Sequence, residues 1–156
     1  MTRENKDFIN RLNLKFGEID KRAENFINKF SKIVKPMVLA EFPNIDSEES
    51  LMLSINDYAI ELFSFTHSSI DKDNEYSDFK KNEELKALTS LVNRLSNDFD
   101  ETEFSTTLHN KAKSLIIDEF AEIYDLSSYG FLILERYAKL KNMAFIAVIK
   151  RLIDNQ

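Results

Sequence analysis

The sequence predicts an all-α protein of about six long helices, and three observations carry this prediction. Apolar residues recur every three or four positions along nearly the whole chain, which is the period of a helix that buries one face. No stretch alternates apolar and polar residues as a half-buried strand does. Only two glycines and two prolines interrupt 156 residues, so few positions force the backbone out of a helix. We expect a single domain over residues 1–156, because this length suits one hydrophobic core.

The first predicted helical segment runs to about Lys35. Its apolar stripe, with steps of three or four residues, is Phe8, Leu12, Phe16, Ile19, Ala23, Phe26, Phe30, Ile33 and Met37. Gly17 could bend or divide this segment, because glycine costs about 1 kcal/mol relative to alanine inside a helix. The pattern leaves open whether residues 4–34 form one helix or two.

Both prolines fall in a short corner between Pro36 and Pro43. Proline fixes its own φ angle and disfavours the α conformation in the residue before it. We therefore expect the long helix to end near Lys35 and a short helix to begin with Pro36 in its first turn. Phe42 follows six residues after Pro36, just before the second break.

Four further helices are expected over residues 48–70, 78–97, 105–126 and 129–154. Asp46 to Glu49 supplies a capping residue and first-turn acids for the first of them, and Ser77 or Asp78 caps the second. The charged segments 71–77 and 98–103 are expected to be loops. The last helix is apolar on more than one face, which is typical of a central helix or of a dimer interface.

Composition and charge exclude several classes of protein. The chain has no cysteine, so it has no disulfide, thiolate metal site or cysteine nucleophile. Residues 36–103 carry five Lys/Arg and sixteen Asp/Glu within a net charge of −6, which disfavours general nucleic-acid binding. The longest apolar block, residues 143–149, is far shorter than the ~20 residues of a membrane span. We expect a cytoplasmic protein.

The side chains that usually support catalysis or metal binding are sparse. The two histidines, His67 and His109, lack the glutamate three residues earlier that a helical di-iron site needs. Residues 71–77 begin like a calcium loop, but Tyr76 stands where that loop needs glycine. We therefore expect neither a metal site nor an enzyme.

Arginines and tyrosines near the apolar stripes are the remaining candidates for binding. Arg94 and Arg136 could each place a guanidinium at the mouth of a cavity, or could be surface arginines with packed stems. Tyr58, Tyr124 and Tyr137 fall on or beside the stripes and are expected in the core.

The order of these helices resembles a globin. Globins carry a proline at the start of their short third helix and a phenylalanine just past its end, six residues apart, as Pro36 and Phe42 are here. The four later helices match the last four long globin helices in order and approximate length. Heme ligation needs a histidine in the segment that corresponds to residues 78–97, and this segment has none. The chain is therefore similar to the bacterial non-heme globin sensor domains of stressosome regulators and sporulation kinases, including plasmid-borne sporulation inhibitors of the anthrax bacillus.

This resemblance implies a non-catalytic regulatory domain. It implies a homodimer formed through the terminal helices and a fatty acid in an internal channel, with a halide nearby and no heme. A free-standing copy would compete with the sensor domain of a histidine kinase for its signal or partner. Arg94, Arg136, His67 or a tyrosine would meet the carboxylate. The residues expected to bind the ligand are Phe30, Leu39, Phe42, Tyr58, Leu62, Phe63, His67, Leu91, Arg94, Leu95, Phe120, Tyr124, Tyr137 and Phe145.

A second function stays open on the sequence alone. The chain could be a helical protein-binding inhibitor of the kind carried by phages or mobile elements. Its acidic middle segment would then mimic nucleic acid or cover a basic partner.

Overall fold

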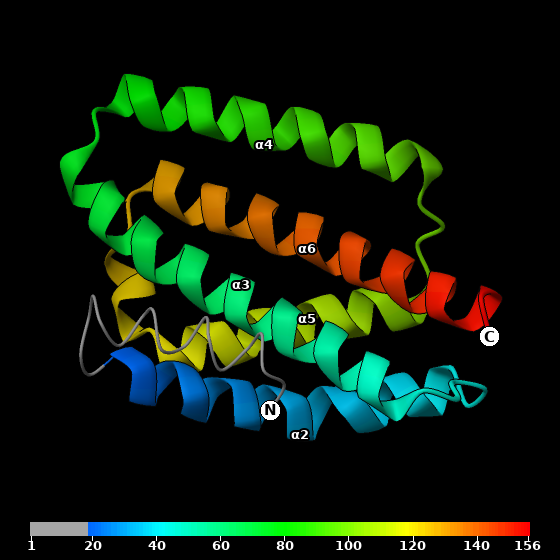
Figure 1. Ribbon diagram of the computed structural model, residues 1–156. Helices are drawn as coiled ribbons and strands as arrows, with labels where there is room; N and C mark the ends of the chain where they lie inside the picture. The colour runs from blue at the N-terminus through cyan, green and yellow to red at the C-terminus, as the bar shows by residue number, and fades with distance from the viewer. Residues whose placement is uncertain (1–18) are drawn as a thin grey trace. The chain divides into compact units, whose positions relative to one another are not determined.

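The computed structural model describes residues 19–156, and these residues form five α-helices and one 3-10 helix (Figure 1). In chain order they are α2 (Ile19–Glu41), α3 (Glu48–Glu75), α4 (Asp78–Asp98), α5 (Glu103–Glu119), η1 (Ala121–Asp125) and α6 (Ser128–Asp154). No strand occurs in this part of the chain, so the all-α prediction is confirmed for it. The helical segment expected before Ile19 lies outside the described residues.

The described residues group into two compact units. One unit comprises residues 19–63 with 147–156, and the other comprises residues 64–146. Both α3 and α6 contribute residues to each unit. Within residues 19–156, no helix is both long and apolar enough to cross a membrane.

Aromatic rings form the core of the first unit. The ring of Phe30, in α2, lies 5.7 Å from that of Phe26 and 5.1 Å from that of Tyr58, in α3. Phe26 in turn lies 5.7 Å from Phe63. Tilted and edge-on rings at such distances attract one another beyond the burial of their surface. This cluster therefore joins α2 to the part of α3 that belongs to the first unit.

The prediction that the first helix ends near Lys35 is wrong, because α2 continues through Pro36 to Glu41. A proline inside a helix costs about 3 kcal/mol, through a lost hydrogen bond and a clash with the preceding turn. Val34 and Val38 lie on either side of Pro36 and are both fully buried, whereas Pro36 itself is exposed. Burial of Val38, which follows the proline, thus outweighs the local tendency of Pro36 to end the helix. The helix ends before Pro43, where the amide of Phe42 still donates to the Val38 carbonyl at 2.8 Å.

Substituting Pro36 with alanine is expected to stabilise the protein by about 1–3 kcal/mol. Alanine restores an N–H group that can donate to the carbonyl four residues earlier, and the exposed position leaves the core untouched. Chemical denaturation measures the change, and Pro43→Ala, beyond the end of α2, serves as the matched control. A destabilised Pro36→Ala variant would mean that the helix breaks at this position after all.

Two further boundaries differ from the sequence prediction, at the end of α3 and at the start of α5. The helix predicted to stop at residue 70 continues to Glu75, so most of the expected 71–77 loop is helical. Ser77 then caps α4 as predicted, accepting a hydrogen bond from the Lys80 amide at 3.2 Å. Thr102 and Ser105 form a reciprocal capping box, which starts α5 at Glu103 rather than at residue 105.

The helix predicted over residues 105–126 ends early, at Glu119, and η1 follows it. A 3-10 helix has three residues per turn, so it changes which side chains face inward. Ile123 is buried, but the neighbouring Tyr124 is 78% exposed. The expectation that Tyr124 lies in the core is therefore wrong.

Candidate functional site

A cavity of about 300 Å³ lies in the second unit, where the end of α4, the first part of α5 and the middle of α6 meet. We call it the His109 cavity. Its lining residues are Ser96, Phe99, Glu101, Ser105, Thr106, His109, Lys113, Glu135, Arg136, Lys139, Asn142 and Met143. The volume is at the lower end of the range of small-molecule sites, about 300–1,000 Å³.

Helical spacing places these side chains on facing surfaces. Thr106, His109 and Lys113 are three and four residues apart, so they share one face of α5. Arg136 and Lys139 share one face of α6 in the same way. The two walls are tied together at one end, because the buried Asn142 side chain donates from Nδ2 to the Ser105 carbonyl at 3.0 Å.

The lining carries more positive than negative charge, although the chain as a whole is acidic. Lys113, Arg136 and Lys139 contribute cations, whereas Glu101 and Glu135 contribute carboxylates. One guanidinium nitrogen of Arg136 lies 3.6 Å from a carboxylate oxygen of Glu135, which offsets part of its charge. The remaining excess of positive charge favours an anionic ligand.

His109 contributes a buried polar atom without a partner. Its Nδ1 atom makes no hydrogen bond to any residue that the structure describes. Burial lowers the pKa of His109, as do the charges of Lys113 and Lys139, and the carboxylates of Glu135 and Glu101 oppose them only in part. The imidazole is therefore neutral at neutral pH. An unsatisfied buried polar atom costs about 1–3 kcal/mol.

The lowered pKa of His109 predicts a pH dependence of stability. Since the folded state disfavours the protonated imidazole, the stabilisation is full above the ordinary pKa of 6.5 and is lost as the pH falls through the folded-state pKa. The free energy of unfolding should thus decline from about pH 7 to pH 5, and the decline should be smaller in His109→Gln than in the control His67→Gln. Denaturation curves across this range measure it. Equal declines in both variants would contradict the prediction.

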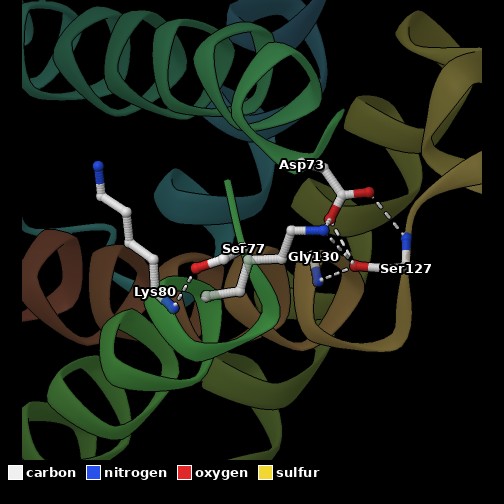
Figure 2. Close-up of polar contacts among 6 residues, drawn as sticks. Asp73, Ser77, Lys80, Ser127 and Gly130 are labelled. Atoms are coloured by element: carbon white, nitrogen blue, oxygen red, sulfur yellow. Dashed lines mark hydrogen bonds and ion pairs between the residues drawn. The ribbon is translucent and has the colours of Figure 1, made fainter. Parts of the chain in front are cut away.

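A second polar cluster in the same unit joins the end of α3 to the starts of α4 and α6 (Figure 2). The Asp73 carboxylate accepts hydrogen bonds from the Ser127 amide, at 2.9 Å, and from the Ser127 hydroxyl. Lys81 Nζ lies 3.3 Å from Asp73 Oδ1, and both side chains are buried, at 9% and 7% exposure. Ser127 Oγ also accepts from the Gly130 amide at 3.1 Å, which caps α6.

This cluster is complete without a ligand. Burial alone would raise the pKa of Asp73, but the hydrogen bonds from Ser127 and Lys81 together with the charge of Lys81 lower it. Gly130 leaves the necessary space, because a Cβ atom there would clash with the Asp73 carboxylate. The neighbouring cavity is only about 10 Å³, too small for more than a water molecule. We therefore assign the cluster a structural role.

The residues expected to bind the ligand are divided between the two units. Phe30, Leu39, Phe42, Tyr58, Leu62 and Phe63 belong to the first unit, and His67, Leu91, Arg94, Leu95, Phe120, Tyr124, Tyr137 and Phe145 belong to the second. In the first unit, Phe30, Tyr58, Leu62 and Phe63 are buried, and Leu39 and Phe42 are half-buried.

In the second unit the expected residues occupy different environments. Phe120 and Phe145 are buried, and His67 and Tyr137 are half-buried. Leu91, Leu95 and Tyr124 are exposed. Arg94 is also exposed and borders a shallow hollow along α4.

None of these fourteen residues lines the His109 cavity. Arg136, considered from the sequence as a partner for a carboxylate, does line it. Sequence reasoning weighed His109 only as a metal ligand and rejected it. The feature of the sequence that could have pointed to this cavity is the spacing of Thr106, His109 and Lys113, which places them on one helical face.

Neither a metal site in the described part of the chain nor a known relative adds to this picture. Among residues 19–156, no group of three or more His, Cys, Asp and Glu side chains is arranged to hold a metal ion. Compared with known protein families, with curated proteins and with solved structures, the chain shows no match.

Proposed function

We propose that the chain is a non-catalytic sensing domain that binds a fatty acid or a similar acid with an apolar part. The His109 cavity carries this proposal. Arg136 and Lys139 would meet the carboxylate of such a ligand, while Phe99 and Met143 offer an apolar surface to the rest of it. Ligand binding would regulate a partner, and the pathway of a sporulation or stress sensor kinase is the candidate.

The proposal extends to a heme-free, globin-like topology and a homodimer formed through the terminal helices. The order of α3, α4, α5 and α6 supports the globin comparison. The continuous α2 counts against it, because the short third helix of a globin has no separate counterpart here. The proposed sensing function therefore depends on the His109 cavity more than on the topology.

Mass spectrometry of small molecules extracted from the purified protein tests the function directly. We expect an organic acid in the extract from the wild-type protein and much less of it from Arg136→Gln. Straight-chain carboxylates added to ligand-free protein should raise its melting temperature. An extract without an acid, together with no thermal shift from carboxylates of any length, would overturn the proposal.

The protein-binding alternative has one observation in its favour. Leu91 and Leu95 lie four residues apart on α4, so they share a face of that helix, and they are 38% and 45% exposed. Apolar side chains that remain exposed together are typical of a protein-binding surface. This alternative becomes the better account if the extraction and the thermal shift are both negative.

A further inference from the structure

We infer that α4 pairs in antiparallel orientation with α4 of a second copy of the chain. The pairing surface is a line of six residues, which we call the α4 seam: Lys80, Glu84, Ala87, Leu91, Arg94 and Asp98. A second copy on this seam would cover Leu91 and the neighbouring Leu95, which are 38% and 45% exposed. The seam is separate from the terminal helices of the proposed homodimer, and the pairing does not depend on a ligand in the His109 cavity.

Little of α4 is covered by its own chain. Of its 21 residues, only Lys81 and Val92 are buried. They are eleven residues apart, which is about three turns, so they mark the inward face of the helix. The α4 seam lies about a third of a turn away from that face. Within the seam Glu84 is half-buried, and the other five residues are exposed. The seam is therefore accessible to a partner.

The spacing of the α4 seam suits a pair of helices. Its successive residues are four and three positions apart in strict alternation. This is the repeat of 3.5 residues that keeps two helices in contact along their length. The seam spans about 27 Å, at 1.5 Å per residue. Ala87 and Leu91 occupy its centre, and charged residues occupy both ends.

The charges of the α4 seam are complementary to those of an identical seam in one orientation. Along the chain the seam has the order positive, negative, apolar, apolar, positive, negative. When a second seam runs antiparallel, Lys80 faces Asp98 of the second copy. Glu84 faces Arg94 in the same way, and the apolar residues meet at the centre. Each ion pair forms twice, because a two-fold axis relates the copies. In a parallel pair, by contrast, like charges would lie at the same level.

The chain itself leaves these charges for a partner. Within residues 19–156, Glu84, Arg94 and Asp98 form no ion pair with another residue. Lys80 Nζ lies 3.7 Å from the centre of the Tyr76 ring, a contact that leaves its positive charge intact. Exposed ion pairs add little affinity, and few apolar residues lie in the seam. We therefore expect association in the micromolar range that weakens as salt is added.

Sedimentation equilibrium over micromolar to millimolar concentrations tests the pairing. The average mass of the wild-type protein should rise with concentration. Glu84→Arg places a second positive charge opposite Arg94, and Arg94→Glu places a second negative charge opposite Glu84. Each variant should weaken association at least about tenfold. Lys86→Glu is the matched control, because it changes the net charge as Arg94→Glu does but lies outside the seam on the same helix. It should change association little.

A mixture of the two charge-reversal variants tests the orientation. When a Glu84→Arg chain meets an Arg94→Glu chain in antiparallel orientation, every charged position again faces the opposite sign. The mixture should thus associate about as tightly as the wild-type protein, although neither variant does so alone. Thermal melts of each variant confirm that it is folded.

Three results would overturn the inference. The first is a wild-type mass that does not rise with concentration. The second is association that neither charge reversal weakens, which would place the contact on another surface such as the terminal helices. The third is a mixture of the variants that associates no better than either variant alone. The extraction of an acid from the purified protein tests the proposed function separately, so each proposal can fail without the other.

Discussion

Replacing Asp73 with alanine is expected to lower the free energy of unfolding by about 3–5 kcal/mol. The Asp73 carboxylate is the acceptor for the Ser127 amide and hydroxyl and is the counter-ion of Lys81. Its removal leaves the buried ammonium group of Lys81 without its counter-ion. It also removes the carboxylate that holds Ser127, the residue that caps α6. Urea denaturation at neutral pH measures the loss.

Two comparisons identify the cause of this loss. Asp71→Ala removes an exposed carboxylate from the same helix and should change stability little. Adding Lys81→Met to Asp73→Ala should recover a large part of the loss, because the unpaired buried charge is then gone. Equal destabilisation by Asp71→Ala, or no recovery in the double variant, would contradict the structural role of the buried pair.

Replacing Phe30 with alanine is expected to cost about 3–5 kcal/mol. Phe30 is fully buried between Phe26 and Tyr58, so the substitution removes an aromatic side chain and leaves a cavity at the centre of the first unit. Denaturation curves measure the cost.

Phe79→Ala is the matched control for Phe30→Ala, since Phe79 is 75% exposed on α4. It should change stability by less than about 0.5 kcal/mol. If Phe30→Ala were as mild as Phe79→Ala, the aromatic cluster would not be the core of the first unit.

The sequence predicts the helices well where periodicity and capping agree. The start of α3 and the capping of α4 by Ser77 follow from short-range rules. The predicted end of the first helix at Lys35 is wrong. Proline chemistry predicts an end there from neighbouring residues alone, whereas the burial of Val38 is a tertiary effect that outweighs it. Likewise, α3 extends to Glu75 beyond its predicted end. Asp73, in this extension, contacts Ser127, which is 54 residues away along the chain and so lies outside short-range rules.

The candidate site is harder to predict than the helices. Apolar stripes direct attention to core residues such as Phe30 and Phe63, which pack within the aromatic cluster of the first unit. The His109 cavity instead combines polar side chains of α5 and α6. Helical spacing shows that His109 and Lys113 share a face, but it does not show that this face meets Arg136.

The most direct test of the central claim is an NMR titration of the two imidazoles with hexanoate. The chain has only two histidines, so their ring ¹⁵N signals report on the two candidate locations separately. We predict that the acid shifts the His109 signals and leaves those of His67 unchanged. Shifts at His67 alone would place binding among the residues expected from the sequence, and no shift at either histidine would contradict ligand binding in the His109 cavity.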